Sequence, residues 1–91
     1  MSIRIEIPPP MRDLTDGKIE IPVRGTTVKE AIADLVNQYP ALKSKLFDDK
    51  GNIRQYINVF VNDEDIRYLD EMETKVTDGV LVALIPAVSG G

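Results

Sequence analysis

The spacing of apolar residues changes along this chain from every second residue to every third or fourth and back again, which limits the folds that it can adopt. Apolar and polar residues alternate over 3–7, as in a half-buried strand, and Pro8–Pro10 ends the pattern. A second alternation over 18–23 follows the turn signal Asp16-Gly17. We expect these two strands to form a hairpin with a long loop, with Pro22 at a sheet edge or strand end.

A helix is predicted from Thr27 to Tyr39. Thr27 and Glu30 fit a capping box, in which the threonine hydroxyl accepts a hydrogen bond from the backbone near Glu30 and the glutamate reaches back to the cap. Pro40 ends the helix. Apolar residues at steps of three and four give it one buried stripe, made of Val28, Ala31, Ile32, Leu35 and Val36.

Strand patterns return in the second half of the chain. After a short helical turn over 42–47, alternation over 57–61 predicts a strand, and a shorter strand is expected around Asp65–Arg67. Asp78-Gly79 then precedes a final apolar strand over 80–85. This order of elements is typical of an α+β fold with one main helix packed on one face of the sheet, and we expect the last strand to lie beside the first.

The composition excludes several classes of function. The chain has 91 residues, 43% of them apolar, which suits one domain with a single core. It contains no Cys and no His, so disulfides, thiolate nucleophiles, imidazole bases and the usual zinc ligands are absent, and we expect no metal site. Neither a membrane-spanning stretch nor a secretory signal is recognisable, so a soluble cytoplasmic protein without a membrane partner is expected.

The charge distribution argues against nucleic acid as a partner. The formal charge is −4, from 15 acidic and 11 basic residues, and no Lys/Arg cluster offers a phosphate-binding surface. Acidic residues gather over 63–78, either as a solvated face or as a field that steers a basic partner surface. These acidic residues are Asp63, Glu64, Asp65, Asp70, Glu71, Glu73 and Asp78.

The chain ends in two glycines shortly after its final predicted strand. Because glycine has no Cβ, Gly90-Gly91 can enter a narrow channel and present the α-carboxylate at its far end, with Ser89 and Val88 completing the threading segment. The alternative is a frayed terminus. We therefore predict a domain over 1–85 and a flexible tail over 86–91, which spans about 20 Å when extended.

Strand alternation also predicts an apolar patch beside the tail. If the odd-numbered residues of 57–61 and the even-numbered residues of 80–84 face the helix, four apolar side chains face the opposite way. Such a patch is either a partner-binding surface or ordinary exposed strand. Its members are Phe60, Leu81, Ala83 and Ile85.

Three segments carry a resemblance to a known family. Val61–Arg67, Asp78-Gly79 and Ile85–Gly91 are similar to the ubiquitin-like sulfur carriers of the ThiS/MoaD family, and the similarity covers nearly the whole chain. The diglycine end is its most specific element. The sequences of residues 61–67 and 86–91 are most similar to those of the carriers that deliver sulfur for cysteine synthesis in actinobacteria. The resemblance implies the β-grasp fold, with a mixed sheet of four to five strands.

The resemblance also implies a mechanism in which the chain is a co-substrate and not an enzyme. An E1-like adenylating enzyme uses ATP to activate the Gly91 carboxylate, sulfide or a persulfide displaces AMP, and the Gly91 thiocarboxylate donates sulfur to an acceptor enzyme such as a cysteine synthase. No bound cofactor is expected, and a tail-cleaving protease is a further candidate partner. Two alternatives stay open, namely a modifier joined to lysines through Gly91 and the small subunit of a molybdopterin synthase.

Overall fold

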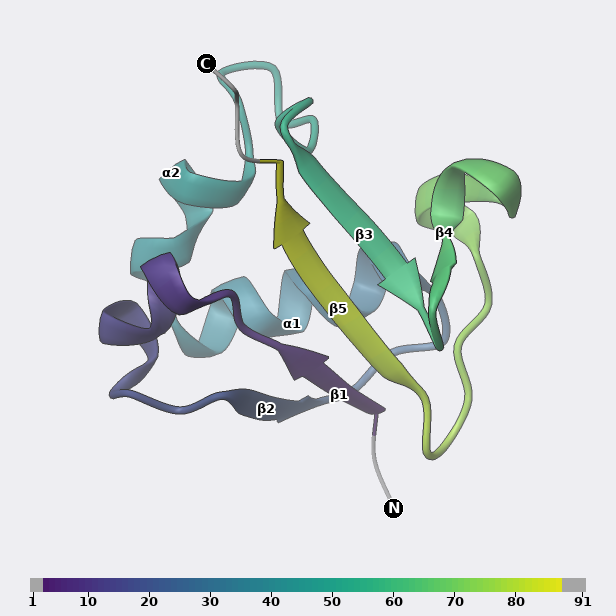
Figure 1. The fold of residues 1–91 in the computed structure, drawn as a ribbon, viewed down its shortest axis with the longest axis horizontal. Coiled ribbons are helices and arrows are strands. Elements are labelled where there is room, and N and C mark those ends of the chain that lie inside the picture. Colours follow the sequence, from purple (N-terminus) through teal and green to yellow (C-terminus); the bar gives the residue numbers. More distant parts are fainter. Residues whose placement is uncertain (1–2, 88–91) are drawn as a thin grey trace.

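The computed structural model describes residues 3–87 of the chain. These residues form a mixed five-stranded sheet with helices packed against one face (Figure 1). The α+β, β-grasp architecture predicted from the sequence is confirmed. The strands are β1 (Ile3–Glu6), β2 (Glu20–Val23), β3 (Ile57–Val61), β4 (Glu64–Asp65) and β5 (Leu81–Pro86). The helices are η1 (Pro9–Thr15), α1 (Val28–Gln38), η2 (Pro40–Leu42), α2 (Lys43–Leu46), η3 (Ile66–Tyr68) and η4 (Glu71–Glu73).

The last strand lies in the middle of the sheet, whose order is β2-β1-β5-β3-β4. β1 and β2 form the predicted antiparallel hairpin, and β5 pairs in parallel with β1 and antiparallel with β3. In the shared register Ile5 lies opposite Ile21 on one side and Val82 on the other. The prediction that the last strand neighbours the first is therefore confirmed, and Pro22 lies in the edge strand β2.

Helix α1 covers one face of the sheet with a fully buried stripe (Figure 1). Its side chains pack on the inward-facing residues of the strands, where Ile5 and Val82 have no exposed surface. Val36 is only partly buried, so the predicted stripe is correct except at its C-terminal end. The fully buried members are Val28, Ala31, Ile32 and Leu35.

The predicted capping box forms, with one change of partner. The Thr27 hydroxyl accepts a hydrogen bond from the Glu30 N–H at 3.2 Å. The Glu30 carboxylate reaches back beyond Thr27 to Thr26, accepting from its N–H at 2.8 Å and its hydroxyl at 2.9 Å. These bonds to Thr26, the backbone one first, lower the pKa of Glu30 below its ordinary value. Thr26 and Thr27, which precede α1, thus form the cap of its N-terminus together with Glu30.

The short fourth strand differs from the prediction. It covers Glu64–Asp65 and not the region around Asp65–Arg67, because the chain turns into η3 at Ile66. The Asp65 carboxylate caps this turn by accepting a hydrogen bond from the Arg67 N–H at 2.9 Å. A local side-chain bond of this kind competes with continued strand pairing. The apolar Ile66 that suggested a strand is instead buried as part of the 3₁₀ turn.

The long loop of the first hairpin contains the 3₁₀ helix η1, which the sequence pattern did not predict. Pro9 and Pro10 lie in its first positions, where a missing backbone N–H costs nothing. Thr15 at its end is completely buried, and its hydroxyl lies 3.0 Å from the carbonyl oxygen of Lys18 and 3.2 Å from that of Arg12. This hydrogen bonding lets a polar side chain occupy the core.

Removal of the Thr27 cap should weaken the fold. We expect Thr27→Ala to lower the free energy of unfolding by about 1 kcal/mol, because the Glu30 N–H loses its acceptor. Urea unfolding followed by circular dichroism measures this change. Thr77→Ala, at an exposed position outside the helices, is the matched control, and an equal loss in both variants would contradict a capping contribution.

Candidate functional site

The face of the sheet opposite α1 carries the apolar side chains that strand alternation predicts there. Phe60 lies opposite Ala83 in the β3–β5 ladder, so both project to the same face, and both are half-buried. Ile85, further along β5, keeps 46% of its surface exposed. We refer to Phe60, Leu81, Ala83 and Ile85 as the outer-face patch.

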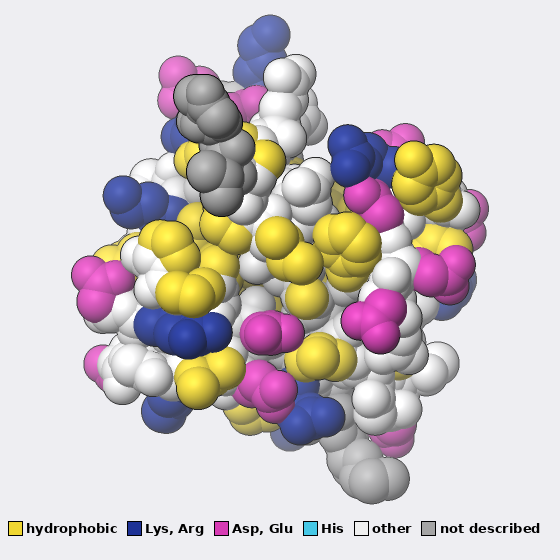
Figure 2. All heavy atoms as spheres, viewed as in Figure 1, with side chains coloured by type: hydrophobic (Ala, Val, Ile, Leu, Met, Phe, Trp, Pro, Cys, Tyr) yellow, Lys and Arg dark blue, Asp and Glu magenta, His cyan; other side chains and the backbone are white. Residues whose placement is uncertain are grey.

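The outer-face patch is bordered by charged side chains (Figure 2). Figure 2 shows hydrophobic side chains gathered over the middle of this face, with acidic side chains among and beside them. On β1, Arg4 lies opposite Leu81 and Glu6 lies opposite Ala83. Arg4 also forms an ion pair with Glu20 of β2, with 2.8 Å between Nη1 and Oε1. An apolar centre with a polar rim is the usual anatomy of a protein-binding surface.

The end of β5 brings the root of the predicted tail next to the outer-face patch. The strand runs to Pro86, one residue beyond the predicted domain boundary, and the Ala87 N–H donates a hydrogen bond to the Tyr56 carbonyl at 2.6 Å. Ile85 of the patch is therefore two residues before the last described residue. The remaining predicted tail residues, Val88, Ser89, Gly90 and Gly91, lie outside the described part of the chain.

Asp65 and Arg67 form an ion pair at the edge of the same face. Asp65 lies opposite Phe60 in the β3–β4 pair and is 8% exposed. Its carboxylate accepts hydrogen bonds from the Arg67 side chain, with 2.6 Å between Nη2 and Oδ2 and 3.1 Å between Nε and Oδ1. Hydrogen bonds from the Arg67 side chain and then its backbone lower the pKa of Asp65. A carboxylate held this way serves structure and is a poor proton donor or acceptor.

Sequence reasoning grouped Asp65 with the exposed acids and missed its pairing with Arg67. The available signal was the spacing, because an Asp two residues before an Arg at the start of a turn can bond both the backbone and the guanidinium of that residue. The apolar residue Ile66 suggested a strand at this position, so the turn and its ion pair were not predicted.

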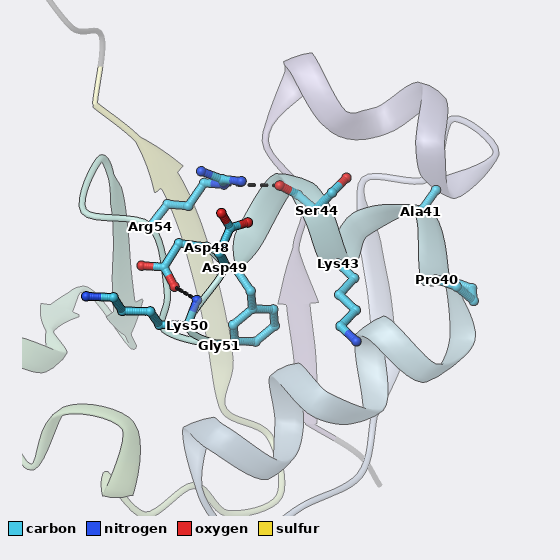
Figure 3. A pocket seen from close by; sticks show the side chains of 10 residues that line it. Pro40, Ala41, Lys43, Ser44, Asp48, Asp49, Lys50, Gly51 and Arg54 are labelled. Carbon is cyan, nitrogen blue, oxygen red and sulfur yellow. Dashed lines mark hydrogen bonds between the residues drawn. The ribbon is translucent and has the colours of Figure 1, made fainter.

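A pocket of about 790 Å³ lies between the segment 40–44 and the loop 47–54 (Figure 3). The Arg54 Nε donates to the Ser44 carbonyl at 3.0 Å across it, and the Asp48 carboxylate accepts from the backbone N–H groups of Lys50 and Asn52 at 2.9 and 3.0 Å. The Asp48 Oδ1 atom is thus already occupied by hydrogen bonds within the 48–52 turn. Throughout residues 3–87, no group of three or more acidic side chains is arranged to hold a metal ion.

Within the same described range, no helix is long and apolar enough to cross a bilayer.

A model of the ThiS family matches residues 5–91. The chain belongs to the ThiS family. It is 33% identical over 93 residues to the sulfur carrier protein CysO of Mycobacterium tuberculosis, and the match covers 100% of both chains. The family predicted from the Val61–Arg67 segment and the diglycine end is therefore confirmed.

Solved structures of similar proteins have the same fold. A chain of the Amycolatopsis orientalis BexX/CysO complex superposes with a TM-score of 0.89 at 34% identity, covering 99% of this chain and 100% of that one. SAMP1, a small archaeal modifier protein from Haloferax volcanii, superposes with a TM-score of 0.82 at 30% identity over 100% of both chains. The fold is thus shared by proteins named as sulfur carriers and by a protein named as a modifier.

The ion pair between Asp65 and Arg67 predicts a pH dependence of stability. Because the pKa of Asp65 is lowered in the folded state, its contribution is complete above the unfolded-state pKa of about 3.9 and is lost as the pH falls through the folded-state pKa. The difference in unfolding free energy between the wild type and Asp65→Asn should therefore be largest near neutral pH and shrink in acid. Urea titrations across this range measure it.

The same comparison in an Arg67→Gln background tests the cause. Without the guanidinium, the difference should lose most of its pH dependence. A profile unchanged by Arg67→Gln would rule out Arg67 as the source.

Proposed function

We propose that this ThiS-family chain is a sulfur carrier whose Gly91 carboxylate is adenylated and then converted to a thiocarboxylate in the cytoplasm. The observation that carries the proposal is that the diglycine Gly90-Gly91 follows Ala87 by only three and four residues in the sequence, and that β5, in the middle of the sheet, ends at Pro86 beside the outer-face patch. The similarity to CysO sulfur carriers over the full chain supports it. The chain acts as a co-substrate of other enzymes and holds no cofactor of its own.

The chemistry requires only the terminal carboxylate from this chain. With a pKa of about 3.5 the carboxylate is ionised at neutral pH, so one of its oxygens can attack the α-phosphorus of ATP and release pyrophosphate. Sulfide, or a persulfide with reduction, then attacks the acyl carbon and AMP leaves. The absence of Cys and His agrees with a carrier that relies on an E1-like enzyme to position ATP and screen charge.

The outer-face patch is the proposed docking surface for the adenylating enzyme. Burial of half-exposed apolar side chains supplies binding free energy without occupying the tail. Ile85 is both a member of the patch and the residue before the strand's last position. A partner bound to the patch therefore holds the root of the tail at a fixed point, from which Val88, Ser89 and Gly90 thread Gly91 into the active site.

Relatives named as modifiers favour a second candidate function. The chain is 38% identical over 65 residues to small archaeal modifier protein 1 of Haloferax volcanii, which covers 71% of this chain and 70% of that protein. A modifier would use the same adenylate but transfer the Gly91 acyl group to a lysine amine, forming an isopeptide bond. The fate of the adenylate therefore separates the two functions. For the carrier, the proposed acceptor is an enzyme such as a cysteine synthase.

Substitution in the outer-face patch should weaken binding to the adenylating enzyme. We expect Phe60→Asp to reduce affinity at least about tenfold, because it places a charge in the apolar centre of the contact. Isothermal titration calorimetry with the purified enzyme measures the change. Tyr68→Asp adds the same charge at a residue that is 86% exposed and outside the patch, so it should bind normally. Equal affinity of Phe60→Asp and wild type would refute this docking mode.

Intact mass spectrometry tests the proposed reaction itself. Incubation with the adenylating enzyme, ATP and a sulfur source should replace one oxygen of Gly91 by sulfur, whereas a modifier would leave Gly-Gly remnants on lysines of target proteins. A chain with one residue appended after Gly91 should load no sulfur, because the reactive carboxylate is displaced from its position. Normal sulfur loading of that extended chain would contradict the mechanism.

A further inference from the structure

One row of outward-facing residues crosses all five strands of the sheet. The strand registers place its members side by side, and their alternation with buried neighbours puts them on the face away from α1. Figure 2 shows acidic side chains among hydrophobic ones on this face. From β2 to β4 the row consists of Glu20, Glu6, Ala83, Phe60 and Asp65. The row therefore combines three carboxylates with two apolar residues of the outer-face patch.

Two of the three carboxylates in this row are paired with an arginine of the same chain. The Glu20 carboxylate lies 2.8 Å from the guanidinium of Arg4, and the Asp65 carboxylate lies 2.6 Å from that of Arg67. In the part of the chain that the structure describes, these are the only two ion pairs. The half-buried Glu6 is therefore the one carboxylate of the row without a cationic partner among the described residues.

Glu6 also lies directly opposite a second carboxylate. Glu6 and Glu20 face each other across the β1–β2 pair, where like charges repel. Arg4 is paired with Glu20, so these three residues together keep one excess negative charge. Arg12 donates its Nε to the carbonyl of Ile7 and forms no ion pair with Glu6. A cation supplied by another molecule would therefore relieve the repulsion at Glu6.

Ala83, next to Glu6 in the row, has the shortest side chain in the outer-face patch. Its neighbours on the same face of β5 are Leu81 and Ile85. Across the sheet, Phe60 lies opposite it on β3 and Glu6 lies opposite it on β1. Because neighbouring strands are about 4.8 Å apart, the backbones at Phe60 and Glu6 are about 10 Å apart, with only a methyl group between them. A partner side chain over the half-buried Ala83 therefore meets apolar groups on three sides and a carboxylate on the fourth.

We propose that an arginine of the adenylating enzyme lies over Ala83 and pairs its guanidinium with the Glu6 carboxylate, while its methylene groups pack against Phe60. This inference rests on the proposed function, because it names the group by which that enzyme recognises the outer-face patch. Arginine suits the position better than lysine, since its guanidinium is more weakly hydrated and forms two parallel hydrogen bonds with a carboxylate. The apolar patch supplies buried area, and Glu6 supplies selectivity for the partner.

Isothermal titration calorimetry with the purified adenylating enzyme tests the role of the Glu6 charge. We expect Glu6→Gln to weaken binding at least about fivefold, because the arginine loses its carboxylate partner. Glu73→Gln makes the same change in net charge at an exposed residue of η4, which packs against α1 and not on the outer face, so it should bind like the wild type. Equal affinities of Glu6→Gln and Glu73→Gln would overturn the proposal.

A second variant tests whether the position over Ala83 is occupied by a partner side chain. Ala83→Leu enlarges the apolar surface of the patch, so a purely hydrophobic contact would keep or gain affinity. An arginine seated over Ala83 would instead be displaced by the larger side chain, and we expect binding to weaken at least about tenfold. Circular dichroism of the variant checks that the fold is retained. Binding of Ala83→Leu that equals or exceeds that of the wild type would contradict the placement of the arginine.

Replacement of the enzyme's exposed arginines by glutamine, one at a time, identifies the partner group. One replacement should weaken binding to the wild-type chain at least about fivefold and add little further loss with Glu6→Gln, as expected for two groups that interact directly. If no arginine is coupled to Glu6 in this way, the inference is wrong. Failure of the proposed function is distinguishable, because the wild-type chain would then neither bind the enzyme nor gain sulfur, and the inference would fail with it.

Discussion

The pairing of β5 between β1 and β3 is the interaction on which the rest of the structure depends. Among residues 3–87, β5 is the strand that joins the N-terminal hairpin to the second half of the chain, through a parallel ladder on one side and an antiparallel ladder on the other. Its inward side chains Val82 and Leu84 lie in the core under α1, and its outward side chains form most of the outer-face patch. One strand thus supplies core side chains, most of the outer-face patch and the attachment of the residues that follow it.

The two faces of the sheet have different surroundings. The inward face packs against α1, whose buried stripe forms part of the core. The outward face instead carries the half-buried side chains of the outer-face patch. The proposed docking of the adenylating enzyme therefore uses the face that does not contribute to the core.

Much of this arrangement could be predicted from the sequence, because strong periodicity reports which face of an element is buried. The alternation at Ile57, Val59 and Val61 correctly placed Phe60 outside, and the Thr27 cap located the start of α1. The early end of β4 was not predicted, because the strand-like pattern around Ile66 was followed instead of the Asp65–Arg67 spacing, which lets the Asp65 side chain bond two residues ahead and end the strand.

The central position of β5 has a consequence for synthesis on the ribosome. Until residue 86 has left the exit tunnel, β1 and β3 have no strand between them and expose their inner edges. The domain cannot complete its sheet early, as it could if its last strand lay at a margin. The first 86 residues must therefore be made before the sheet closes, and shorter nascent or prematurely terminated products remain accessible to chaperones and proteases. A partner that recognises the closed sheet would thereby select chains that extend at least to residue 86.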